Sequence, residues 1–160
     1  MLTHRVSVAM LAVALSASAP ALAKELFIAD LSGDQEVPAA ISTPTSGKFH
    51  IQFNKDYTEA EFTLRVDDGD QLFMAHLHCA PVGSNGPVVV WLAGQHPPPG
   101  GWNVDGKWIG NTILNNSNIV NTACGADLAG LAAAMRAGGV YVNVHSRANP
   151  AGEIRGQIVP

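Results

Sequence analysis

Apolar and polar side chains alternate along several short runs of this chain, most regularly between Tyr57 and Val66. Successive side chains of a strand point to opposite faces, so a period of two places every second residue on the same side. One face of this run would carry Ala60, Phe62, Leu64 and Val66, and the other Glu59, Glu61, Thr63 and Arg65. The pattern predicts an antiparallel strand with one side buried and one side in water.

Further runs of the chain have strand character. They cover residues 25–31, 48–53, 73–79, 88–91, 140–145 and 153–159. Turn-forming residues separate them, including an acidic turn at Asp67–Asp70 and another turn at Pro81–Pro87. Residues 94–123 are the least predictable part of the domain, and residues 111–122 within them have neither a helical nor a strand period. Short strands with frequent turns predict an all-β fold, an antiparallel β-sandwich of the immunoglobulin-like or superoxide-dismutase-like Greek-key kind.

One short helix is expected at residues 127–137. Asp127 is a suitable N-cap, and Gly138 suits the position just after the C-terminus. Apolar residues recur between them at helical spacing, namely Leu128, Leu131 and Met135. Such a stripe indicates packing against the core of the protein.

The first 23 residues have the features of a signal peptide. Arg5 precedes an apolar run from Val6 to Ala17, which is too short to span a bilayer. Ala21-Leu22-Ala23 then places small residues where a signal peptidase cleaves, although an uncleaved anchor is the alternative. We therefore expect an exported protein, periplasmic or extracellular, with a mature domain at residues 24–160 and no membrane span in it.

The charge of the chain argues against some classes of partner. The sequence has nine Lys and Arg against thirteen Asp and Glu. Removal of the leader takes away Arg5 and no acidic residue, which leaves eight against thirteen and a net charge of −5. A mildly acidic chain without a basic cluster does not favour binding to nucleic acid.

Two cysteines, Cys79 and Cys124, occur in the chain. An even number of cysteines in an exported protein favours a disulfide. The alternative is a thiolate ligand for a metal beside His78. Cys79 should, however, point to the opposite face of its strand from that histidine, which favours the disulfide.

The histidines are the most chemically informative residues of the sequence. His76 and His78 are two residues apart on an expected strand, so both imidazoles project from one face. If the strand that ends at His145 lies alongside, three imidazoles could hold copper or zinc. Met74 shares that face and could add a thioether for Cu(I), and Glu153 could accept a hydrogen bond from a ring.

The same side chains could instead form a structural hydrogen-bond network. Asn143, Glu153 and Arg155 would join the histidines there and fix the register of the strands. In this interpretation Arg155 contacts either Glu153 or a backbone carbonyl. The sequence alone leaves the metal site and the structural network as alternatives.

Other chemistry is not indicated. The spacing of Asp67, Asp68 and Asp70 is too short for a calcium loop of the EF-hand kind and predicts a solvated turn. The sequence contains no Gly-x-Ser-x-Gly nucleophile motif and no glycine-rich phosphate loop. We expect no enzymatic activity.

Several blocks of the sequence resemble the CHRD (chordin-type) domain family. They are His76-Leu77-His78, Gly86–Val90 and the long block Tyr141–Gln157, and Leu31–Pro38 is similar to the N-terminal motif of the family. The resemblance covers about residues 25–159. It implies an extracellular module, because in animals the domain occurs as repeats in chordin, an antagonist of bone morphogenetic proteins. Bacterial members are single exported domains.

A weaker likeness is to copper/zinc superoxide dismutase, which also has a His-x-His strand close to a glycine-rich loop. The bridging histidine and the zinc ligands of that family have no counterpart here, since His50 and His96 lack the matching spacing. The likeness therefore does not support a redox enzyme. We expect a non-enzymatic binding or interaction module with an unknown protein partner, or alternatively a periplasmic copper- or zinc-binding protein that uses His76, His78 and His145.

Overall fold

The computed structural model describes residues 24–94 and 97–160, and the expected signal peptide at residues 1–23 lies outside them. Seven strands form one sheet with antiparallel pairings, namely β1 (Glu25–Ser32), β2 (Ser46–Phe53), β3 (Ala60–Cys79), β4 (Val88–Ala93), β5 (Trp102–Leu114), β6 (Val140–Ser146) and β7 (Ile154–Gln157). The described helices are α1 (Leu128–Arg136) and the short 3-10 helices η1 (Gly33–Gln35), η2 (Asn116–Asn118) and η3 (Thr122–Cys124). The prediction of an all-β antiparallel fold with one short α-helix is confirmed.

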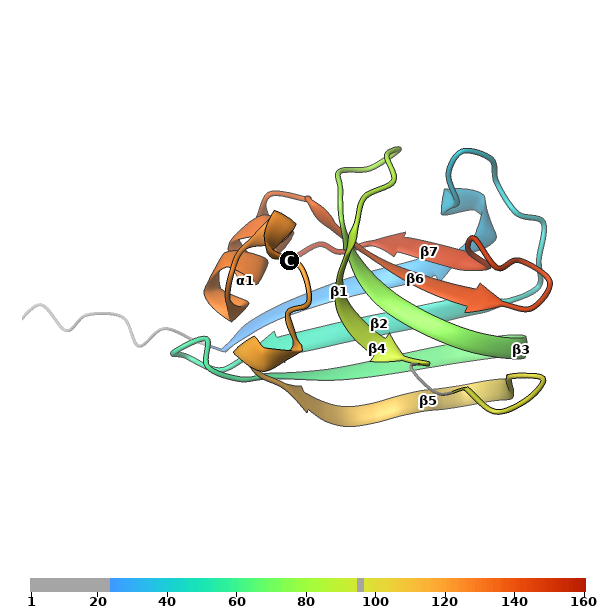
Figure 1. Cartoon of the computed structure of the whole chain (residues 1–160), viewed down its shortest axis with the longest axis horizontal. Helices are drawn as coiled ribbons and strands as arrows, with labels where there is room; N and C mark the ends of the chain where they lie inside the picture. Colours follow the sequence, from blue (N-terminus) through green and yellow to red (C-terminus); the bar gives the residue numbers. More distant parts are fainter. Residues whose placement is uncertain (1–23, 95–96) are drawn as a thin grey trace, which may run out of the picture.

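The sheet closes on itself. Its strand order runs β2-β1-β7-β6-β3, and β3 pairs back onto β2, so five strands form a ring. β4 and β5 pair with β3 outside this ring. The pairing is therefore that of a closed five-stranded barrel rather than the two separate sheets of the expected sandwich (Figure 1).

Closure depends on β3, which is twenty residues long. The prediction of an acidic turn at Asp67–Asp70 is wrong, because these residues lie inside β3. Asp68 and Gln71 have positive φ angles of 55° and 47°, and the pairing with β5 shifts register around Gly69. Bulges of this kind bend a strand without ending it. The first half of β3 consequently pairs with β2 and β5, and the second half with β6 and β4.

The interior of the barrel follows the predicted alternation. Ala60, Phe62, Leu64 and Val66 are each at most 1% exposed. Asp127 caps α1 by accepting a hydrogen bond from the backbone N–H of Gly130, as expected. The apolar stripe of α1 is buried at one end of the barrel (Figure 1). The largest fully buried side chains are Phe27, Phe49, Ile51, Phe53, Phe62, Leu64, Leu72, Leu77, Leu128, Leu131, Met135 and Ile154.

Residues 94–123, for which the sequence predicted no helix or strand, contain the thirteen-residue strand β5. Among the described strands it pairs with β3 alone, so one of its edges is unpaired, and most of its side chains are at the surface. Trp102, Val104 and Trp108 are half-buried and alternate with exposed residues, but Gly106 interrupts the apolar series. An edge strand of this kind carries a weak hydrophobic signal.

Within the described residues, no helix has the length and apolar character needed to cross a membrane.

Candidate metal centre

β6 is buried on both of its faces. All seven of its residues are buried, and Val140, Val142 and Val144 belong to the hydrophobic core. The alternate residues of β6 point away from the barrel interior. The loops of residues 33–45 and 80–87 lie on this outer side of β6 and β7 (Figure 1). We call the outward side chains of the adjacent strands β3, β6 and β7 the polar outer face: Met74, His76, His78, Tyr141, Asn143, His145, Arg155 and Gln157.

The pairing of β3 with β6 brings the three predicted histidines together. His76 lies opposite Asn143, His78 opposite Tyr141, and Met74 opposite His145. The Nδ1 atom of His76 is 3.1 Å from the Nε2 atom of His145. One ligand atom from each of His76, His78 and His145 lies within 4.8 Å of the other two. The gathering predicted from strand alternation is confirmed.

Backbone carbonyls fix the orientation of two of the rings. The Nδ1 atom of His78 lies 2.9 Å from the carbonyl oxygen of Gly86, and that of His145 lies 3.0 Å from the carbonyl oxygen of Pro150. Because a carbonyl oxygen only accepts, each Nδ1 carries the hydrogen and each Nε2 presents a lone pair. Such an outer hydrogen bond is the usual support of a metal-binding histidine.

The cluster retains buried nitrogen atoms without a partner. The Nε2 atoms of His76 and His78 are buried and have no hydrogen-bond partner among the described residues. Within the same residues, the Nε2 atom of His145 accepts from Nδ1 of His76, and a hydrogen at that position leaves Nε2 of His76 as a bare acceptor. Buried polar atoms without partners are rare and costly in folded proteins. The three rings therefore offer more acceptors than the surrounding residues supply donors.

The surroundings keep these imidazoles neutral. Burial, together with the nearby rings of His145 and His78, lowers the pKa of His76 from 6.5 to about 3. Burial also lowers the pKa of His145 to about 4, against the opposing effect of the Pro150 carbonyl. The pKa of His78 falls for the same reason, with Arg155 adding to the effect. Neutral imidazole is the form that binds transition metals.

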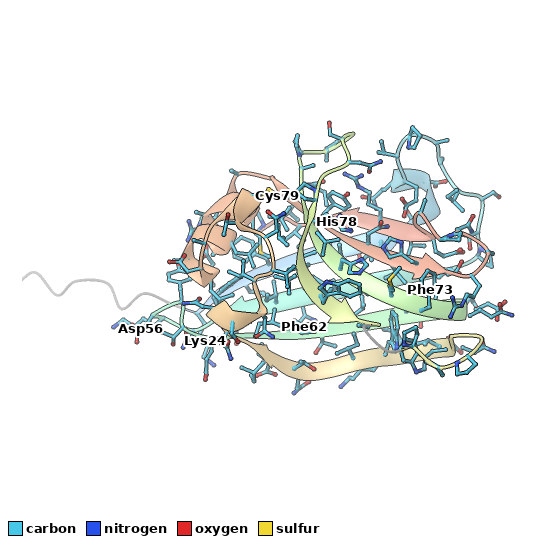
Figure 2. The ribbon with its side chains drawn as sticks, viewed as in Figure 1. Lys24, Asp56, Phe62, Phe73, His78 and Cys79 are labelled. Carbon is cyan, nitrogen blue, oxygen red and sulfur yellow. A yellow bond between two sulfur atoms is a disulfide. The ribbon has the colours of Figure 1, made fainter. Side chains whose placement is uncertain are left out.

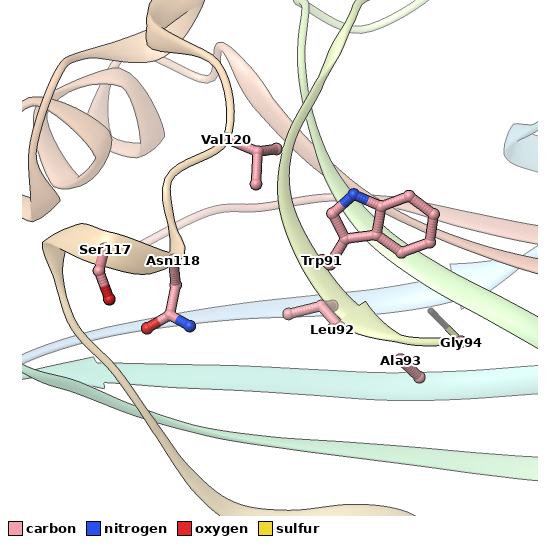
Figure 3. A pocket seen from close by; sticks show the side chains of 7 residues that line it. All are labelled: Trp91, Leu92, Ala93, Gly94, Ser117, Asn118 and Val120. Carbon is pink, nitrogen blue, oxygen red and sulfur yellow. The ribbon is translucent and has the colours of Figure 1, made fainter. Parts of the chain in front are cut away.

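Two aromatic side chains enclose the cluster. The ring of Tyr141 stacks on that of His78 at 4.8 Å between centroids, and the ring of Trp91 meets that of His76 edge-to-face at 4.2 Å. Trp91 also lines a pocket of about 330 Å³ beside Asn118 and Val120 (Figure 3). The sequence did not indicate these contacts, because a ring partner across strands depends on the register, which no local pattern encodes.

Asn143 and Arg155 belong to a hydrogen-bond network beside the histidines. Asn143 donates from Nδ2 to the carboxylate of Glu36 at 2.6 Å, and burial raises the pKa of Glu36. Arg155 donates to the backbone carbonyl of Ser84 at 2.8 Å and to Oδ1 of Asn85 at 2.9 Å. Of the two contacts expected for Arg155, the structure thus contains the one to a carbonyl.

Glu153 supports the turn after β6. Its carboxylate accepts hydrogen bonds from Ser146 and Asn149, both at 2.6 Å, and from Thr43. Burial alone would raise the pKa of Glu153, but these hydrogen bonds outweigh it and lower the pKa. Among the hydrogen bonds of the described residues, the histidine rings donate to the carbonyls of Gly86 and Pro150 and, from His76, to the ring of His145, and none donates to Glu153.

Cys79 and Cys124 form the predicted disulfide, with their Cα atoms 5.6 Å apart. The bond joins the end of β3, directly after His78, to η3 (Figure 2). Because the sulfur of Cys79 is bonded to that of Cys124, it does not serve as a thiolate ligand.

Replacing Arg155 should loosen the loop that contains Ser84, Asn85 and Gly86. The guanidinium lies 3.5 Å from the centroid of the Tyr141 ring, and Arg155 is 2% exposed. Arg155→Met keeps much of the stem but leaves the acceptors of the loop unpaired, so we expect a loss of about 2–3 kcal/mol in the free energy of unfolding. Urea denaturation measures this loss, and hydrogen exchange measures the opening of the loop.

Arg147→Met is the matched control for that change. Arg147 also lies over an aromatic ring, 4.6 Å from the centroid of Phe73, but it is exposed. We expect it to cost at most about 0.5 kcal/mol. Equal effects of the two substitutions would contradict the role given to Arg155.

Comparison with known proteins identifies the family of the chain. The family model of the CHRD domain matches residues 27–158, which is nearly the whole sequence. Neither the curated proteins nor the solved structures gave a significant match. The matched region contains the three clustered histidines and both cysteines of the disulfide. The chain belongs to the CHRD domain family.

Proposed function

We propose that this protein is an exported, non-enzymatic CHRD-domain module that binds one copper or zinc ion through His76, His78 and His145. The observation that carries the proposal is the pair of buried Nε2 atoms, on His76 and His78, that have no hydrogen-bond partner within residues 24–94 and 97–160. A metal ion would satisfy them, since imidazole nitrogens are preferred ligands of both metals. Export is proposed from the features of residues 1–23 and the disulfide.

The geometry of the cluster supports an ion better than a closed hydrogen-bond network. One ligand atom from each of the three rings lies within 4.8 Å of the other two, so modest movements of the rings would bring three nitrogens to one ion. The nitrogens that are 3.1 Å apart are Nδ1 of His76 and Nε2 of His145, and an ion bound at that Nε2 atom would replace their hydrogen bond. The carbonyls of Gly86 and Pro150 hold two rings in the required orientation.

Burial supports binding rather than catalysis. His76 is 3% exposed and His145 is 6% exposed, and Trp91 and Tyr141 cover the rings. A substrate would therefore have little access to an ion held between them. An enclosed ion suits a protein that stores, delivers or is stabilised by the metal.

Titration of the purified protein, freed of metal with a chelator, tests this function. We expect one equivalent of copper or zinc to bind with a dissociation constant of about 1 µM or lower. The double substitution His76→Ala/His78→Ala removes two ligands and should weaken binding by more than about 100-fold. Isothermal titration calorimetry gives the stoichiometry, and quenching of tryptophan fluorescence by copper that is reduced in Trp91→Phe locates the ion beside His76.

His50→Ala is the control for the loss of an imidazole. His50 is exposed on β2, and its replacement should leave the affinity unchanged. Absence of binding tighter than about 1 µM, or binding that the double substitution does not weaken, would contradict the proposed function.

A further inference from the structure

The three ligands supply no negative charge. All are imidazoles, and two of them are almost completely buried. The buried carboxylates nearby, Glu36 and Glu153, accept hydrogen bonds from Asn143 and from Ser146 and Asn149, and within the described residues neither accepts one from a ring. No ligand of the cluster would therefore neutralise any of the positive charge of the bound ion.

A buried site without anions discriminates against a divalent ion. The cost of transferring an ion from water into a medium of low dielectric rises with the square of its charge, so it is roughly four times larger for a dication than for a monocation of the same size. Arg155 adds a positive charge on the same face, where its guanidinium lies against Tyr141, the residue stacked on His78. Both features favour a monovalent metal.

Met74 adds a ligand type with the same preference. It lies two residues before His76 on β3 and directly opposite His145 on β6, and it is half-buried. Directly opposed residues of an antiparallel pair have Cβ atoms about 4.5–5.5 Å apart. The thioether is therefore placed beside one of the three imidazoles, and thioether sulfur is a soft donor that selects Cu(I) over Zn²⁺.

We propose that the ion of this site is Cu(I), and that the thioether of Met74 is its fourth ligand. This inference rests on the proposed metal-binding function and adds to it the metal, its oxidation state and one donor atom. Three neutral imidazoles and one neutral thioether hold a monovalent ion with a total charge of only +1.

Competition with chromophoric chelators tests the choice of metal. The Cu(I) affinity is measured without oxygen in the presence of a reductant, and the Zn²⁺ affinity is measured on the same protein. We expect Cu(I) to bind at least about 100-fold more tightly than Zn²⁺. Zn²⁺ binding as tight as that of Cu(I) would overturn this inference and leave the proposed function standing. Failure of both ions to bind would overturn both.

Two substitutions of Met74 test the ligand and the charge argument separately. Met74→Leu keeps the volume and removes the sulfur, so we expect Cu(I) to bind about 10-fold more weakly and Zn²⁺ to bind as before. Met74→Glu supplies the missing negative charge and should strengthen Zn²⁺ binding. Unchanged Cu(I) affinity in Met74→Leu would overturn the fourth ligand, and unchanged Zn²⁺ affinity in Met74→Glu would overturn the charge argument.

Discussion

Loss of the disulfide between Cys79 and Cys124 is expected to lower the free energy of unfolding by about 4 kcal/mol. The two residues are 45 positions apart in the sequence, so the bond restricts a long loop of the unfolded chain. In the chain-entropy model, most of the stabilisation comes from that restriction. The double substitution Cys79→Ser/Cys124→Ser, followed by urea denaturation, measures the loss.

The same variant should lose stability but keep its metal binding. The imidazoles are placed by the pairing of β3 with β6, which extends from Leu72 to Cys79 and does not depend on the sulfur atoms. We therefore expect the folded double serine variant to keep a stoichiometry of one metal ion. A loss of less than about 1 kcal/mol in the free energy of unfolding would contradict the stabilisation assigned to the disulfide. Reduction of the wild-type protein should cause the same loss of about 4 kcal/mol as the double substitution.

The second large effect is a loss of stability in acid by the metal-free protein. Burial holds the pKa of His76 at about 3 and that of His145 at about 4, whereas the value for an exposed histidine is 6.5. Below pH 6.5 the unfolded chain binds protons that the folded protein does not. The contribution of these two histidines to the free energy of unfolding is therefore complete above about pH 6.5. It is lost as the pH falls from there through the pKa values of the folded protein.

At pH 5 these two histidines should together lower the free energy of unfolding by about 4 kcal/mol relative to pH 7.5. Glu36 opposes the loss in part, because its raised pKa makes the folded protein bind a proton more readily than the unfolded chain. Urea denaturation between pH 7.5 and 4, with a chelator present, measures the profile. A flat profile for the wild type would contradict this prediction, and His76→Gln/His145→Gln should reduce the slope.

Much of the candidate site was predictable from local pattern. The two-residue spacing of His76 and His78 fixes their common face, and the alternation from Val140 to His145 fixes the face of the third histidine. Likewise the cap at Asp127 placed the helix correctly. These features depend on backbone sterics and on hydrogen bonds between near neighbours in the sequence, so a short window of residues contains the information.

The closure of the sheet was not predictable in this way. A turn was expected at Asp67–Asp70, because acidic residues and glycine are common in turns. The structure keeps these residues in β3 and uses bulges to bend the strand, since both halves find pairing partners. β5 was missed for a related reason. Its assignment depends on the long-range pairing with β3 more than on its own side chains.

The sequence by itself determined the strand faces, the disulfide and the identity of the three imidazoles, because period-two alternation and residue chemistry are local properties. Only the tertiary structure decided that one ligand atom of each ring lies within 4.8 Å of the other two, that the carbonyls of Gly86 and Pro150 orient two of the rings, and that no carboxylate hydrogen-bonds to them among the described residues. These facts depend on the register of β3 against β6 and on the paths of two loops. Contacts between residues far apart in the sequence set both, and a local pattern does not contain them.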